Sequence, residues 1–169
     1  MSDIELYRQM HAAGHFPGHS TKKHSKAIKE LIDKHGAKTL LDYGSGKGHQ
    51  YYIHKLHDEW GVEMPTLYDP AVPGIDAPPR GRFDGVICTD VLEHLAGSDL
   101  SLAIERCIAR ADKFVLFSIC TRPAKKLLPD GRNAHITLES VDWWRGYVRA
   151  IADDLFPDKP PPEIRLEFE

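Results

Sequence analysis

Short apolar runs alternate with amphipathic stretches along most of this chain. Continuous apolar runs predict strands that are buried on both faces, and each is followed by polar or glycine-rich residues. A last run alternates between apolar and polar residues after three consecutive prolines, which predicts a further strand. The predicted strands cover residues 39–41, 66–68, 83–89, 114–119 and 164–168.

Helical periodicity fills the intervals and the N-terminal region. Residues 3–13 are weakly amphipathic, and residues 21–35 form a stronger stripe that Ser20 is expected to cap and Gly36 to end. Further helices are predicted over residues 99–111 and after Ser140, with Trp144, Val148, Ile151 and Leu155 as the buried stripe of the latter. Another helix, before Gly61, is expected to bury Tyr52, Ile53, Leu56 and Trp60.

Strands that alternate with helices predict an α/β fold with a doubly wound, mostly parallel sheet and helices on both faces. We expect residues 1–36 to form a helical N-terminal extension and residues 37–169 to form the main domain. Phe16-Pro17-Gly18 interrupts the extension, which suggests a lid over whatever the main domain binds.

Composition narrows the function classes. The chain is 41% hydrophobic and 28% charged, as in ordinary globular proteins, and its net charge of −3 argues against non-specific nucleic-acid binding. No apolar run has the length of a membrane span, and the first residues lack a signal-peptide pattern, so we expect no membrane association. Three cysteines without a CxxC pair predict neither a disulfide framework nor a structural zinc site, and they favour a reducing, cytoplasmic location.

Ten histidines raise the question of a metal. His11, His15 and His19 recur every four residues, but glycine and proline interrupt the helix that would align them. His54 and His57 have no evident third ligand. We therefore expect no metal site.

The segment Asp42-Tyr43-Gly44-Ser45-Gly46-Lys47-Gly48 joins the first strand to a helix, at the edge where open α/β sheets bind ligands. A phosphate-binding P-loop is excluded because Leu41 stands where its first glycine belongs and Gly48 follows the lysine. The dinucleotide fingerprint is excluded because His49 replaces its third glycine. An acid before three alternating glycines suits a ligand with a cationic amino group that the backbone approaches closely.

These residues resemble the first motif of class I S-adenosylmethionine-dependent methyltransferases, which have Rossmann-like sheets, here expected to hold five to six strands. The run from Phe83 to Leu95, FDGVICTDVLEHL, resembles their fourth-strand motif. Tyr68-Asp69-Pro70 and the stretch from Asn133 to Trp144 are similar to a small branch of that superfamily.

The resemblance implies S-adenosylmethionine as cofactor and assigns roles by position. Asp42 and the backbone of residues 43–48 would hold the methionine part, and Asp69 would bind the ribose hydroxyls. Thr89, Asp90 and Val91 would line the sulfonium side, whereas Leu92-Glu93-His94 is largely structural in the family. The complete set implied for cofactor binding is Asp42, Tyr43, Gly44, Ser45, Gly46, Gly48, Asp69, Pro70, Thr89, Asp90 and Val91.

One departure from the family pattern concerns the adenine. Only 13 residues separate Asp69 from Phe83, too few for a full helix and a third strand, which leaves Asp76 as a candidate adenine ligand.

The acceptor and the catalytic base are inferred from the loop after the fourth predicted strand. His135 is the candidate general base for an oxygen or nitrogen nucleophile, with a loop-stabilising hydrogen bond as the alternative role. Basic residues in this loop favour an anionic small molecule, such as a phosphorylated sugar or a nucleotide-like compound. They are Arg122, Lys125, Lys126 and Arg132.

Two other functions stay open. A shortened sheet without a separate substrate domain would also suit a non-catalytic partner module that binds S-adenosylmethionine. A nicotinamide-dependent oxidoreductase is the second alternative.

Overall fold

The computed structural model describes residues 2–169 and contains a five-stranded sheet in which every pair of neighbours is parallel. The strand order β2-β1-β3-β4-β5 confirms the predicted doubly wound α/β fold, which is Rossmann-like. The chain passes from β2 to β3 with no helix or strand between them, as the short interval predicted. The strands are β1 (Leu40–Tyr43), β2 (Thr66–Tyr68), β3 (Phe83–Thr89), β4 (Ala111–Ile119) and β5 (Glu163–Phe168).

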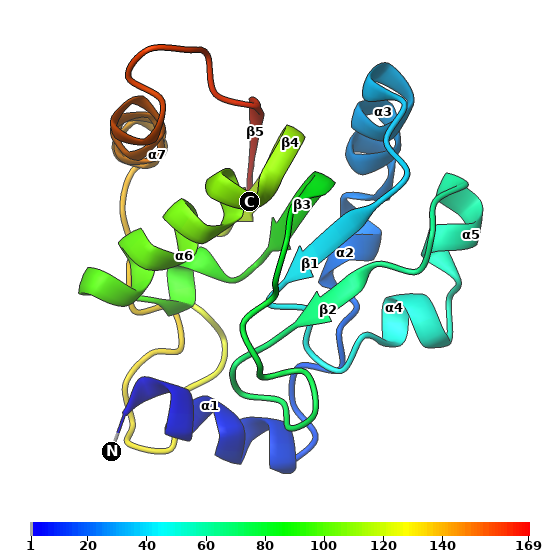
Figure 1. The fold of residues 1–169 in the computed structure, drawn as a ribbon. Helices are drawn as coiled ribbons and strands as arrows, with labels where there is room; N and C mark the ends of the chain where they lie inside the picture. Colours follow the sequence, from blue (N-terminus) through cyan, green and yellow to red (C-terminus); the bar gives the residue numbers. More distant parts are fainter. Residues whose placement is uncertain (1) are drawn as a thin grey trace.

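Helices cover both faces of the sheet (Figure 1). One face packs against α3 (Ser25–His35) and α5 (Leu56–Trp60), and the other against α6 (Gly97–Arg110) and α7 (Val141–Leu155). Each face has its own apolar core because successive residues of a strand point to opposite sides. Phe114 and Leu116 belong to the first core, whereas Val115 and Phe117 belong to the second.

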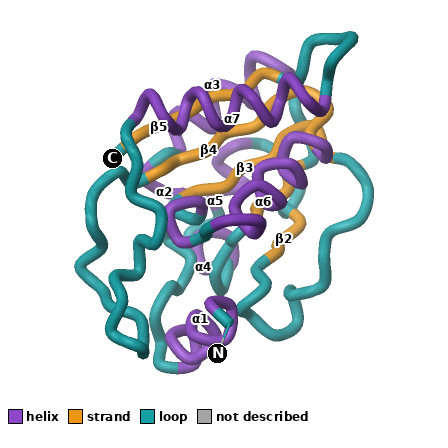
Figure 2. The backbone as a smooth tube through the Cα atoms, turned by 90° about the vertical axis from the view of Figure 1, so that its left-hand side faces the viewer, coloured by secondary structure: helices purple, strands orange, loops and turns teal. Residues whose placement is uncertain are grey.

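The N-terminal extension lies at the end of the sheet where the strands finish. Figures 1 and 2 show α1 (Asp3–Ala12) beyond the carboxyl ends of the strands. Its buried Leu6 and Met10 form a third apolar cluster with Leu128 and Ala134 of the β4–α7 loop. The extension is therefore packed onto the main domain.

The predicted helix over residues 21–35 is interrupted. Residues Ser20–Lys23 form a separate short helix, α2, and His24 joins it to α3. The prediction that Ser20 is the N-cap was wrong, because Ser20 is the first helical residue of α2. The N-cap residue is His19, whose side chain makes no capping hydrogen bond. Gly36 ends α3 in the left-handed conformation, as predicted.

The helix after the glycine loop is also divided, into α4 (His49–Tyr52) and α5. Lys55 separates them with φ 54°, a conformation that ends an α-helix. The prediction of buried Tyr52 and Ile53 was wrong, because these side chains are 60% and 61% exposed and Tyr51 is buried instead. Leu56 and Trp60 are buried as predicted.

The helix α7 largely follows its prediction. The Ser140 side chain accepts a hydrogen bond from the Trp143 amide, which is the expected N-cap. Trp144 and Val148 are fully buried, and Ile151 packs against the same core. The stripe ends there, since Leu155 is 37% exposed. No helix in residues 2–169 has the length and apolar character needed to cross a membrane.

Candidate functional site

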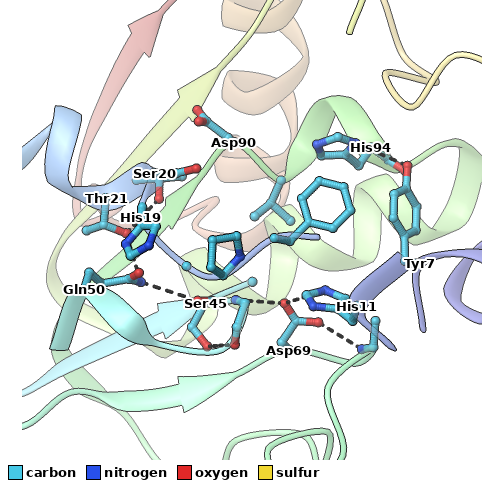
Figure 3. A pocket seen from close by; sticks show the side chains of 18 of the residues that line it. Tyr7, His11, His19, Ser20, Thr21, Ser45, Gln50, Asp69, Asp90 and His94 are labelled. Carbon is cyan, nitrogen blue, oxygen red and sulfur yellow. Dashed lines mark hydrogen bonds and ion pairs between the residues drawn. The ribbon is translucent and has the colours of Figure 1, made fainter. Parts of the chain in front are cut away.

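A cavity of about 310 Å³ opens at the carboxyl ends of β1, β2 and β3. The chain leaves β1 for β2 on one side and returns to β3 on the other, so the cavity lies at the topological switch point, where open α/β sheets bind ligands. Its volume is within the range of small-molecule sites, roughly 300–1,000 Å³. Its walls come from the three strand ends and the N-terminal extension (Figure 3).

Most of the predicted cofactor residues line this cavity. The structure brings together Gly44, Ser45, Gly46, Asp69, Pro70, Thr89, Asp90 and Val91, which come from three separate segments. Asp42, Tyr43 and Gly48 do not line it, and neither does the candidate adenine ligand Asp76.

The glycine loop is held close to its neighbours. Gly44 has φ 84°, and a Cβ added to it would lie 2.3 Å from Cγ2 of Val91. The amide groups of Gly44 and Ser45 both donate to the Tyr68 carbonyl, which ties the loop to the end of β2. A side chain at residue 44 would therefore displace the wall that Val91 forms.

Asp69 organises the loop from the next strand. Its Oδ2 accepts a hydrogen bond from the Gly46 amide at 2.9 Å, and its Oδ1 accepts one from the Ala71 amide at 2.9 Å. Nε2 of His11, on α1, lies 3.9 Å from Oδ2. An ionised carboxylate has about four acceptor sites. Asp69 therefore keeps acceptor capacity for ligand hydroxyls.

Asp42 lies behind the cavity wall. Its Oδ2 accepts hydrogen bonds from Gln50 Nε2 at 2.9 Å and the Tyr51 hydroxyl at 2.8 Å. Complete burial raises the pKa of Asp42 to about 6. Gln50 lines the cavity and Asp42 does not, so Asp42 is connected to the cavity through the Gln50 side chain. The sequence reasoning missed Gln50, whose only signal was its place in the first turn after the glycine loop.

The segment Phe16-Pro17-Gly18, which we call the strap, lies directly on the glycine loop. The carbonyls of Pro17 and Gly18 accept hydrogen bonds from the amides of His49 and Gln50. A Cβ on Gly46 would lie 2.7 Å from the Phe16 carbonyl oxygen. The strap thus forms one wall of the cavity, in the place expected of a lid.

The helices on either side of the strap complete that wall. On α2, the Thr21 hydroxyl lies 3.0 Å from the Thr89 hydroxyl at the end of β3. On α1, the Tyr7 hydroxyl donates to the Ala134 carbonyl at 2.8 Å, and His11 faces Asp69. Tyr7 and His11 are four residues apart, so they share one helix face, a spacing that could have marked them in the sequence.

Two histidines stand near the acceptor end of the site, and only one lines the cavity. His94 lines it, and burial lowers its pKa to about 4, so that its imidazole is neutral at pH 7. The candidate base His135 does not line it, and its Nδ1 lies 2.5 Å from the Arg122 carbonyl oxygen. The geometry thus favours the loop-stabilising role for His135 over direct contact with an acceptor.

The basic loop contributes one cation to the cavity. Lys126 lines it, with Nζ 4.5 Å from the centre of the Phe16 ring, and no salt bridge is found for it within residues 2–169. Arg132 instead pairs with Asp3 and Asp130, and Arg122 and Lys125 are not in the lining. Among the basic residues of this loop, Lys126 is therefore the one placed to attract an anionic ligand.

Comparison of the chain with models of protein families, with curated proteins and with solved structures gave no match.

Proposed function

We propose that this chain is an S-adenosylmethionine-dependent methyltransferase that acts on an oxygen or nitrogen nucleophile of an anionic small molecule. One observation carries the proposal: the three segments that resemble methyltransferase motifs meet around a single cavity at the switch point of the sheet. The polar groups there suit the parts of the cofactor. Asp69 offers acceptors for the ribose hydroxyls, and the glycine loop allows its backbone to approach the methionine part closely.

The cofactor supplies a methyl group already activated on a sulfonium. The task of the protein is then to hold the acceptor in line and to exclude water, and such alignment can contribute about 7–11 kcal/mol. Val91 and Leu95 form apolar wall beside Asp90, and the strap covers the glycine loop. Lys126 has no acidic partner among the described residues and is placed to attract an anionic acceptor.

Calorimetric titration with S-adenosylmethionine and S-adenosylhomocysteine tests the proposal. We expect micromolar binding of both, weakened at least tenfold by Asp69→Ala. The matched control is Asp153→Ala, which removes an exposed carboxylate on α7, outside the cavity lining, and it should bind as the wild type does.

Failure of both compounds to bind would overturn the proposal. Binding of a nicotinamide dinucleotide in their place would favour the oxidoreductase alternative. Cofactor binding without methyl transfer to any phosphorylated sugar or nucleotide tested would favour the non-catalytic module.

A further inference from the structure

Next to the cavity, three side chains from two segments far apart in the chain converge. Glu93 and His94 belong to the short 3₁₀ helix η1 (Leu92–His94), and His135 belongs to the β4–α7 loop. One potential ligand atom from each lies within 4.8 Å of those of the other two. The His94 and His135 rings meet edge to face, with their centres 4.9 Å apart.

Each of these side chains has one polar atom fixed by the backbone. Oε1 of Glu93 accepts a hydrogen bond from the Cys120 amide at 3.0 Å. Nδ1 of His94 lies 2.7 Å from the Ala134 carbonyl, and Nδ1 of His135 lies 2.5 Å from the Arg122 carbonyl. An imidazole that donates its Nδ1 proton to a carbonyl keeps Nε2 as a lone-pair nitrogen.

The other polar atom of each side chain is without a partner. Oε2 of Glu93 is fully buried and accepts no hydrogen bond within residues 2–169, although a buried carboxylate oxygen is costly to leave unpaired. Likewise, Nε2 of His94 and Nε2 of His135 make no hydrogen bond within residues 2–169. Metal-binding histidines in proteins show this arrangement, in which the second nitrogen is fixed by a backbone carbonyl.

We propose that Glu93, His94 and His135 bind a divalent transition metal of the zinc type. Two imidazoles and one carboxylate are a common donor set for Zn²⁺, and three protein ligands leave a coordination position open. His94 is part of the cavity wall, so the ion borders the cavity. The open position would take an oxygen of the acceptor, such as a hydroxyl or a carboxylate, and this role of the ion depends on the proposed methyltransferase function.

The expectation of no metal site rested on the cysteine spacing and on histidines along the first 57 residues. This trio joins residues 93 and 94 to residue 135, and their proximity arises from the tertiary structure. Backbone hydrogen bonds hold the two segments together, since the Glu93 carbonyl accepts from the amides of Ile136 and Thr137.

Titration of the metal-free protein with ZnCl₂ by calorimetry tests the site, and CoCl₂ provides a visible absorption spectrum that reports the coordination geometry. We expect one tight equivalent of Zn²⁺, weakened at least tenfold by His135→Ala and by the isosteric Glu93→Gln. The matched control is His15→Ala, which removes an exposed histidine outside the trio and should leave that equivalent unchanged.

Absence of a tight equivalent would overturn the proposal, as would a tight equivalent that survives His135→Ala. The His135 side chain is only partly buried, so this variant is expected to fold even if Glu93→Gln does not. Titration of S-adenosylmethionine is a separate measurement. Metal binding without cofactor binding would refute the proposed function and support the metal site. Cofactor binding without metal binding would support the proposed function and refute the metal site.

Discussion

Replacing Gly44 with alanine tests the geometry that closes the glycine loop against β3. The new Cβ would lie 2.3 Å from Cγ2 and 3.0 Å from Cγ1 of Val91, whereas carbon atoms pack best at about 3.5–4.0 Å. The residue would also have to keep φ at 84°. Left-handed strain costs about 1–2 kcal/mol and overpacking about 1–3 kcal/mol, so we expect a loss of about 2–5 kcal/mol in the free energy of unfolding.

Gly36→Ala provides the matched control. Gly36 has φ 57°, and a Cβ there would meet no atom within 4 Å, so that variant carries only the backbone strain. Urea unfolding followed by circular dichroism measures both losses. In a Val91→Ala background the loss caused by Gly44→Ala should shrink, because the two clashing methyl groups are gone. Equal losses for the two glycine variants, or no change with Val91→Ala, would refute the reasoning.

Three further predictions concern the core, the buried acid and the extension. Trp144→Ala should lower the free energy of unfolding by about 3–5 kcal/mol, because the side chain is fully buried. Trp143→Ala should lower it far less, since Trp143 is 37% exposed and stacks on Tyr147. Urea unfolding compares the two variants. Because burial raises the pKa of Asp42, its protonated form stabilises the fold below about pH 4, and this stabilisation is lost as pH rises through about 6. Asp42→Asn should therefore flatten the dependence of the free energy of unfolding on pH over that range. An unchanged dependence would show that Asp42 does not titrate there. Deletion of residues 1–20 should weaken S-adenosylmethionine binding in calorimetry, since it removes the strap and α1 from the cavity wall; unaltered affinity would refute the lid role.

The strands could be predicted from two patterns: continuous apolar runs mark strands buried on both faces, such as β3, and alternation of apolar and polar residues marks the edge strand β5. Residues 66–68 and 83–89 were predicted with the bounds that the structure shows, and β5 begins one residue earlier than predicted. The helix predicted over residues 99–111 is α6, Gly97–Arg110, and it could be predicted because a helix between the sheet and solvent needs one apolar side. These patterns are local, because the residues of a single strand or helix carry each of them.

Short helices near the site were predicted less well. Tyr51 was not assigned to the core because α4 is only one turn long and has no repeat to reveal its buried side. Its side chain belongs to the apolar core under α3 and α5, and its hydroxyl donates to Asp42. Similarly, α2 separates from α3 at His24, and Thr21 of α2 contacts Thr89 at the carboxyl end of β3, 68 positions along the chain.

The sequence by itself determined the α/β class, the parallel order of its elements and the strand ends that carry Gly44, Asp69 and Asp90, because hydrophobic periodicity and glycine placement are local properties. Only the tertiary structure decided which side chains face one another. In the tertiary structure the strap lies on the glycine loop, and His135 lies outside the cavity lining, beside Glu93 and His94. These contacts join segments far apart in the chain, and they depend on how loops pack at one edge of the sheet, for which a single sequence has no periodic signal.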